Sequence, residues 1–147
     1  MTESKTISTP NQSGPLSADA LREMIQRAPF HKWLGLDLVS VDEESVTIEA
    51  PWRDEFVSSV KYGYCHGGVL ASLVDLTADF AIAARIGRGA PTVDLRVDYH
   101  RTAMPGKLTA VGKVIKLGRT LATAEAQVLD EQGKLVASGR GVFLLAQ

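Results

Sequence analysis

The sequence predicts an α+β domain in which an antiparallel sheet of about six strands curls around one long helix. The first observation is the stretch 66–86, the longest helical candidate, in which apolar residues lie on nearly every side. Such a helix must be covered by the rest of the chain. The second observation is that most of the remaining chain alternates apolar and polar residues, which is typical of half-buried strands. A chain of 147 residues can bury one core of this kind without disulfides.

The composition excludes several classes of function. Sixteen Lys and Arg residues against 17 Asp and Glu residues give a net charge of -1 without any basic stretch, so no nucleic-acid partner is expected. One cysteine cannot form an internal disulfide, and three scattered histidines lack metal-ligand spacing, so no metal site is expected. Residues 1–16 are polar and contain no apolar core of a secretion signal. They predict a disordered tail on a cytoplasmic protein, followed by a single domain over 17–147.

The chain before the long helix predicts one helix and two strands. Ser17 is a suitable N-cap for an amphipathic helix, which Pro29 ends. The stretch 51–65 shows no periodicity and is rich in aromatic residues, so we expect a loop that leads into the long helix. The predicted elements are, in chain order, a helix over 18–28, a turn over 29–35, and strands over 36–41 and 45–50 joined by a hairpin at 42–44.

The long helix carries one narrow polar stripe. Gly68, Ser72, Asp75 and Asp79 follow one another at spacings of four, three and four residues, which places them on one side of a helix. Two aspartates near the middle would each cost roughly 2.5 to 3.5 kcal/mol in a bilayer, so we expect a core helix and no membrane partner. The chemistry of the protein is expected along this stripe.

The chain after the long helix alternates apolar and polar residues through four predicted strands. Val93, Leu95, Val97 and Tyr99 occupy one face of the first strand, with charged residues on the other. Tight turns between consecutive strands predict an antiparallel meander, and the small residues of the third strand leave room for a helix. The strands are predicted over 93–100, 108–117, 120–129 and 135–145, with turns at 105–106, 118–119 and 130–133 and small side chains at Ala122, Ala124 and Ala126.

Several short motifs stand at fixed distances within this pattern. They are His66-Gly67-Gly68, Leu73-Val74-Asp75, Gly89-Ala90-Pro91, Thr92-Val93-Asp94-Leu95 and Leu117-Gly118-Arg119-Thr120. On these residues the chain, from Pro29 to its C-terminus, resembles the hot-dog fold and acyl-CoA thioesterases of the phenylacetate-degradation (PaaI) type.

The start of the long helix is a candidate oxyanion site. Glycines at the first turn can admit a ligand to N–H groups that lack partners within the helix and carry the positive end of its dipole, although they could also form a simple flexible joint. The resemblance implies that the Gly67 N–H polarises the thioester carbonyl and that Gly68 lines the substrate site. His66 is expected to cap the loop and fix the surroundings of the carbonyl, with a direct catalytic role as the alternative.

Asp75 is the candidate catalytic acid. A carboxylate flanked by apolar residues is costly to bury, and burial raises its basicity, which suits attack on a thioester or activation of water. A hydrogen-bonded acid at a subunit contact is the alternative. The resemblance implies that Asp75 is catalytic, that Asp79 lines the pocket or an interface, and that the Thr92 hydroxyl holds the water or the acid. A threonine that merely begins a strand is the alternative for Thr92.

Three further residues are candidates for a role in the site. Cys65 stands beside His66, but adjacent residues of an extended segment point to opposite faces, which disfavours a thiol nucleophile. Arg119 could contact a CoA phosphate, although an arginine in a hairpin is usually a solvated charge. Several relatives carry Asn or Gln at the substrate-binding position that corresponds to Val60, so this chain departs from their pattern there.

These residues together predict hydrolysis of a small acyl-CoA or aryl-acyl-CoA thioester to a free acid and CoA. No separate cofactor is implied, because CoA is part of the substrate. A non-catalytic acyl-CoA binding module and a hot-dog hydratase are the alternatives, since a fold does not fix a function. An exposed edge strand and a half-open helix predict a homo-oligomer, either a dimer or a dimer of dimers.

Overall fold

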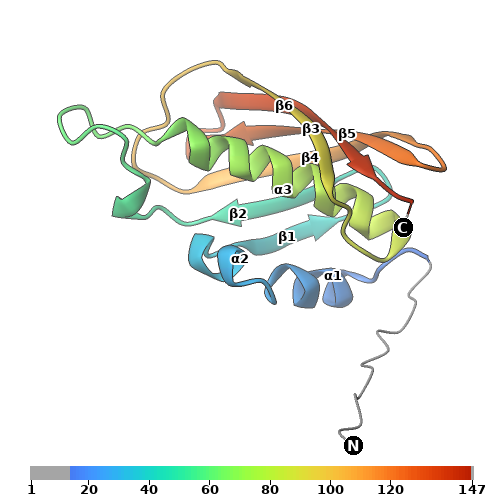
Figure 1. Cartoon of the computed structure of the whole chain (residues 1–147). Helices are drawn as coiled ribbons and strands as arrows, with labels where there is room; N and C mark the ends of the chain where they lie inside the picture. Colours follow the sequence, from blue (N-terminus) through green and yellow to red (C-terminus); the bar gives the residue numbers. More distant parts are fainter. Residues whose placement is uncertain (1–13, 147) are drawn as a thin grey trace, which may run out of the picture.

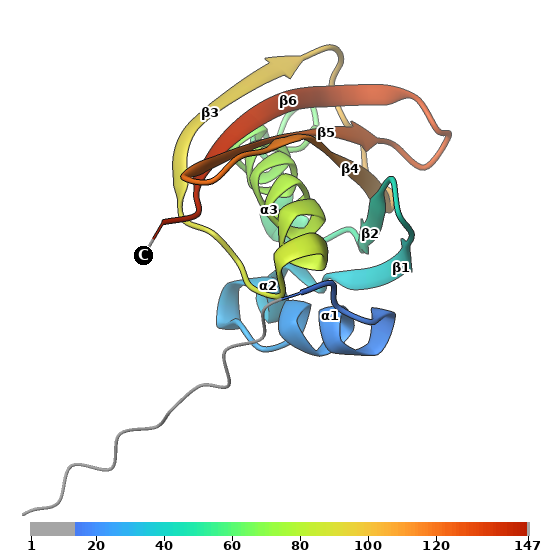
Figure 2. The same ribbon diagram turned by 90° about the vertical axis from the view of Figure 1, so that its right-hand side faces the viewer.

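The computed structural model describes residues 14–146, in which a curved sheet wraps around one long helix (Figure 1). Figure 2 shows the strands as an arc around this helix, with two short helices beneath it. The elements are α1 (Ala18–Ile25), α2 (Pro29–Leu34), β1 (Asp37–Val41), β2 (Val46–Ala50), the 3-10 helix η1 (Asp54–Phe56), α3 (Gly67–Ile86), β3 (Thr92–Tyr99), β4 (Leu108–Leu117), β5 (Leu121–Leu129) and β6 (Leu135–Leu144).

The six strands form one antiparallel sheet in the order β1-β2-β4-β5-β6-β3. Inside its curve, α3 packs mainly against β4, β5 and β6, while α1 packs against β1. This arrangement confirms the predicted α+β class and the hot-dog fold that the resemblance implied. No helix in the described part of the chain is long and apolar enough to span a membrane.

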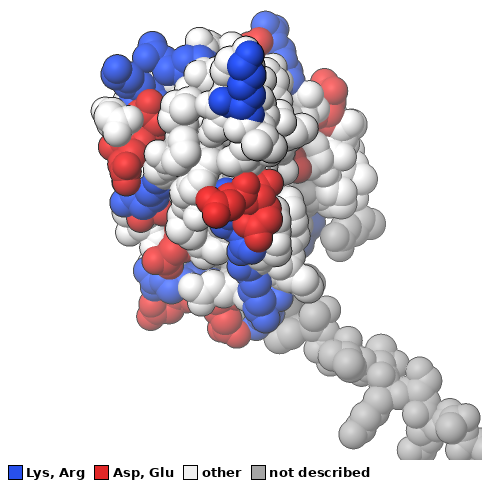
Figure 3. All heavy atoms as spheres, turned by 90° about the vertical axis from the view of Figure 1, so that its left-hand side faces the viewer, with Lys and Arg blue, Asp and Glu red and all other residues white. Residues whose placement is uncertain are grey.

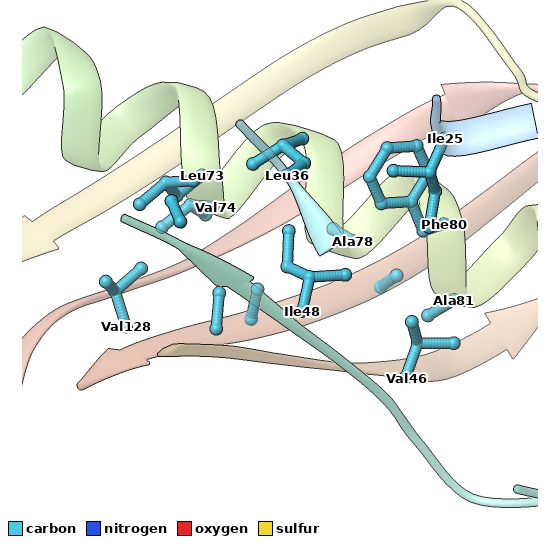
Figure 4. Packing of buried hydrophobic residues seen from close by; sticks show 14 of the residues in the cluster. Ile25, Leu36, Val46, Ile48, Leu73, Val74, Ala78, Phe80, Ala81 and Val128 are labelled. Atoms are coloured by element: carbon cyan, nitrogen blue, oxygen red, sulfur yellow. The ribbon is translucent and has the colours of Figure 1, made fainter. Parts of the chain in front are cut away.

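Small residues let α3 sit close to the sheet. The alanines predicted to make a small face on β5 are fully or almost fully buried. On β4, a Cβ atom added at Gly112 would lie 2.3 Å from the carbonyl oxygen of Thr77, so only glycine allows this approach. Figure 4 shows Leu73, Val74 and Ala78 of α3 among apolar side chains of the neighbouring strands. The helix is therefore held on this side by close apolar packing.

The predicted meander is wrong for its first strand. Of the four strands in the predicted meander, β4, β5 and β6 follow one another in space, whereas β3 lies at the edge of the sheet and pairs with β6. Residues 100–107 are long enough to carry the chain from β3 to β4 across the end of the sheet. A Cβ atom added at Gly139 of β6 would lie 2.3 Å from the carbonyl oxygen of Arg96, so this glycine permits the close pairing with β3.

The helical boundaries before β1 also differ from the prediction. The first helix ends at Ile25, three residues before the predicted end, and the predicted turn at 29–35 is mostly the short helix α2. Pro29 occupies the first turn of α2, where its missing N–H is not needed. Gly35 ends the helix in the left-handed conformation at φ 69°. The turn between β4 and β5 is shifted by one residue, because Gly118 N–H donates to the Leu121 carbonyl.

The domain begins slightly before its predicted boundary. Residues 1–13 of the predicted tail lie outside the described residues. Leu16, the last residue of that tail, packs against the core, and its N–H donates to the Ala84 carbonyl at 2.9 Å. This residue therefore belongs to the folded domain.

Candidate active site

His66 is the N-cap of α3. Its Nδ1 atom accepts a hydrogen bond from the Gly68 N–H at 2.8 Å. This bond occupies the Gly68 amide and holds the imidazole at the start of the helix, as the predicted capping role requires. The Gly67 N–H, at the first helical position, has no acceptor among residues 14–146. It is free to bind an oxygen atom at the positive end of the helix dipole.

Tyr99 supports this helix start from β3. Its hydroxyl donates to the Gly67 carbonyl at 2.9 Å, and a Cβ atom added at Gly67 would lie 3.2 Å from the tyrosine ring. The sequence placed Tyr99 on the inner face of its strand but gave it no role in the site. The alternation of apolar and polar residues in β3 could have indicated this contact, because the inner face of β3 is the one that meets α3.

Asp75 and Thr92 meet as predicted. The Thr92 hydroxyl donates to Oδ1 of Asp75 at 2.7 Å, and Asp75 is half-buried in the single chain. The other carboxylate oxygen has no hydrogen-bond partner among the described residues. A carboxylate held at one oxygen and open at the other can accept a proton from water or attack a carbonyl carbon.

A β-bulge turns Thr92 toward Asp75. Strict alternation would place Thr92 on the outer face with Asp94. In the pairing with β6, however, Thr92 lies opposite Phe143 and Leu95 lies opposite Gly141, with a register shift between Thr92 and Asp94. Thr92 and Leu95 therefore share the inner face, because the bulge contains one extra residue.

Asp79 contacts the loop that joins α3 to β3. Its Oδ1 atom accepts a hydrogen bond from the Ala90 N–H at 2.8 Å. Burial raises the pKa of Asp79 to about 6, and the nearby Asp75 adds to this rise, while the Ala90 hydrogen bond opposes it. The carboxylate therefore lies beside Asp75 on the same stripe but is engaged with backbone.

Cys65, Val60 and Arg119 take no part in the hydrogen bonds described above. The Cys65 thiol donates to the carbonyl of the adjacent His66 at 3.5 Å. Cys65 is buried, and burial raises the pKa of its thiol to about 11, so it is no thiolate nucleophile at neutral pH. Val60 is fully exposed in the loop before α3. Arg119 lies in the β4–β5 turn, at the opposite end of α3 from Gly67 (Figure 1).

The two catalytic candidates on α3 are too far apart to act on one carbonyl. Gly67 and Asp75 are separated by eight residues, which corresponds to roughly 12 Å along a helix axis. The free N–H at a helix start also points away from the helix body. An oxyanion donor must lie about 3 Å from the carbonyl oxygen, and an attacking atom about 3 to 3.5 Å from the reacting carbon.

The molecular face nearest the start of α3 shows no concentration of one charge. In Figure 3, acidic and basic side chains are interspersed over this face, with uncharged surface between them. Electrostatic attraction by a large patch of one sign is therefore not a feature of this face.

Comparison with known proteins identifies the family. A model described as thioesterase superfamily matches residues 62–137, which is more than half of the chain. Mouse acyl-coenzyme A thioesterase 13 is 34% identical over 107 residues, covering 70% of this chain and 74% of the mouse protein. A solved structure of a protein from the thioesterase superfamily is 44% identical, with a TM-score of 0.85, and covers 87% of this chain and 97% of that chain.

The PaaI resemblance is confirmed by a solved structure. The E. coli PaaI protein from the phenylacetic acid degradation operon is 25% identical, with a TM-score of 0.79, and the match covers 88% of this chain and 92% of that chain. The motif that begins at His66 and the helix that follows it lie within the matched family segment. The chain therefore belongs to the thioesterase superfamily and is a hydrolase.

Proposed function

We propose that this protein hydrolyses the thioester of a small acyl-CoA or aryl-acyl-CoA to a free carboxylic acid and CoA. The observation that carries the proposal is the Asp75 carboxylate on the polar stripe of α3. One of its oxygens accepts a hydrogen bond from the Thr92 hydroxyl. The Gly67 N–H at the helix start supports it as a donor to the carbonyl oxygen. Acyl-CoA is the substrate class named for the mouse relative.

In the proposed reaction, Asp75 works in one of two ways. As a general base it takes a proton from water while the water oxygen bonds to the thioester carbon. As a nucleophile its oxygen bonds to that carbon and forms an anhydride, which water then hydrolyses. In both routes the Gly67 N–H stabilises the oxyanion, the C–S bond breaks, and the thiolate of CoA leaves and takes up a proton.

The proposed site is shared between two copies of the chain. The separation of roughly 12 Å between Gly67 and Asp75 requires that each carbonyl receive these groups from different copies. The edge strand β3 supports such an assembly, because within residues 14–146 it pairs only with β6 and it exposes Val93 and Tyr99. Light scattering should give a mass of at least twice 15.8 kDa at micromolar concentration. A stable monomer would contradict the shared site.

Thiol release from a panel of acyl-CoA esters tests the activity. We expect turnover of short acyl or aryl-acyl esters, detected by a reagent for the free thiol of CoA. Binding of these esters without thiol release would instead identify a non-catalytic binding module. Water addition to an unsaturated acyl-CoA without thiol release would identify a hydratase. Both outcomes would contradict the proposed hydrolysis.

A further inference from the structure

The loop between α3 and β3 is fixed at several points before it reaches Thr92. The Ala90 N–H is bound by Asp79, and the Pro91 carbonyl accepts from the Leu144 N–H at 2.9 Å. The Arg88 guanidinium donates to the Leu145 carbonyl. Of these three anchors, the one to Asp79 is the only one made by α3, the helix that also carries Asp75.

The loop and the Asp79 carboxylate fit closely together. A Cβ atom added at Gly89 would lie 3.1 Å from Oδ2 of Asp79, so the absence of a side chain lets the loop approach the carboxylate. Ala90 is buried, and its N–H would lose its acceptor if Asp79 lacked an oxygen. The contact therefore holds the loop at a defined distance from α3.

This anchor lies two residues before Thr92. The hydrogen bond from the Ala90 N–H fixes the end of the loop against one turn of α3, and the Thr92 hydroxyl donates to Asp75 one turn earlier on the helix. The bulge that turns Thr92 inward follows directly, between Thr92 and Asp94. A shift of the loop would move the hydroxyl, because only Pro91 separates the two anchored residues.

We propose that Asp79 is a positioning residue that places Thr92 on Asp75 through the Ala90 N–H. This inference rests on the proposed function, in which Asp75 acts on the thioester. It differs from the expectation that Asp79 lines the pocket or an interface, because a lining residue would act on substrate binding or on assembly. A positioning residue acts on the catalytic step instead.

Amide hydrogen exchange tests the anchor without any catalytic measurement. In the full-length protein, Asp79→Ala should speed exchange at Ala90 by at least about tenfold, because the acceptor is lost. Asp79→Asn keeps an oxygen acceptor and should keep Ala90 protected. Asp94→Ala, which removes an exposed carboxylate from β3, is the matched control and should leave the exchange rate of Ala90 unchanged. Equal protection of Ala90 in the parent and in Asp79→Ala would overturn the proposal.

Steady-state kinetics test the consequence for catalysis. Asp79→Ala should lower kcat about tenfold to a hundredfold with little change in KM, since misplaced catalytic groups lose rate on this scale. Asp79→Asn should restore most of kcat. In a double-mutant cycle, Asp79→Ala combined with Thr92→Val should be no slower than the slower single variant, because both changes act through one hydroxyl. Additive losses, or a raised KM with unchanged kcat, would overturn the proposal.

A second variant keeps the test open if Asp79→Ala does not fold. Gly89→Ala leaves the carboxylate in place but puts a methyl group against it, so it should lower kcat and speed Ala90 exchange to a smaller extent. An unchanged kcat together with unchanged exchange in this variant would contradict the anchor. A parent protein without thiol release, but with Asp79-dependent protection of Ala90, would show that the proposed function fails while the anchor exists.

Discussion

The two sides of α3 are held by different forces. Toward β4 and β5, the helix meets alanines and a glycine that are buried without polar contacts between side chains. Toward β3, it is joined by hydrogen bonds from Tyr99, Thr92 and Ala90, and most residues of that strand are exposed. The β4–β5 side therefore supplies stability through packing, whereas the β3 side supplies defined polar geometry. Changes on the two sides should therefore have separable effects.

Asp75→Asn should have the largest effect, and it should fall on activity alone. The amide keeps the size of the side chain and most of its hydrogen bonding but loses the negative charge. Thiol release should fall by about a hundredfold or more, while the melting temperature stays the same or rises. A structural acid would show the reverse: a lower melting temperature and activity in proportion to the folded fraction.

Gly112→Ala should have the opposite signature on the packed side. The new methyl group meets the Thr77 carbonyl, whose oxygen lies 2.3 Å from an ideal Cβ position, so helix and strand must move apart. We expect a loss of about 1 to 3 kcal/mol in the free energy of unfolding, measured by denaturant titration. Lys113→Ala, an exposed neighbour, is the control. Equal stability in both variants would show that the approach of α3 to β4 is not tight.

Asp79→Asn should raise stability in a pH-dependent way. Because the pKa of Asp79 is raised to about 6 in the folded protein, the acid form favours folding at low pH, and this contribution is lost as the pH rises through 6. The variant should therefore exceed the parent by about 1 to 3 kcal/mol at pH 7 and match it near pH 4. Thermal melts at both values measure the difference. A gain of equal size at pH 4 would exclude the buried charge as its cause.

Tyr99→Phe should have the smallest effect. It removes the hydroxyl that binds the Gly67 carbonyl and leaves the ring that packs on the glycine. A single hydrogen bond of this kind contributes about 0.5 to 1.5 kcal/mol, so kcat should fall by no more than about tenfold. Stability should change little, since Tyr99 is 54% exposed. A loss as large as that of Asp75→Asn would mean that the phenol itself takes part in the reaction.

The sequence predicted those elements whose signal is local. The long helix was predicted within one residue, because apolar residues lie on nearly every side of it and Gly87 ends it. The position of β3 could not be predicted, since alternation shows that a strand is half-exposed but not which strand it pairs with. The helix α2 was missed because Pro29 was taken as the end of the first helix, whereas that helix ends at Ile25 and Pro29 begins the next one.

The candidate site was predicted in part: two of its residues were identified, but several of its contacts were not. Asp75 and Thr92 were identified and do meet, although alternation alone would have turned Thr92 outward. A bulge depends on the pairing between two strands, and the residue pattern of β3 alone does not predict it. The contacts of Asp79 with Ala90 and of Tyr99 with Gly67 were missed for the same reason, since they join segments that are distant in sequence.

The distance between Gly67 and Asp75 has a consequence for mixtures of defective chains. Gly67→Pro would remove the free N–H at the first helical position, where the backbone suits proline, and His66 already has backbone angles that suit the residue before a proline. The new Cβ atom would lie 3.2 Å from the Tyr99 ring, so this half-exposed side chain must shift slightly. A chain with this change and a chain with Asp75→Asn would each be inactive alone. If the Gly67 N–H and the Asp75 carboxylate of each site come from different copies, a mixed dimer contains one intact site and one site in which both groups are defective. Equal mixing should then restore about a quarter of the parent activity, because about half of the dimers are mixed.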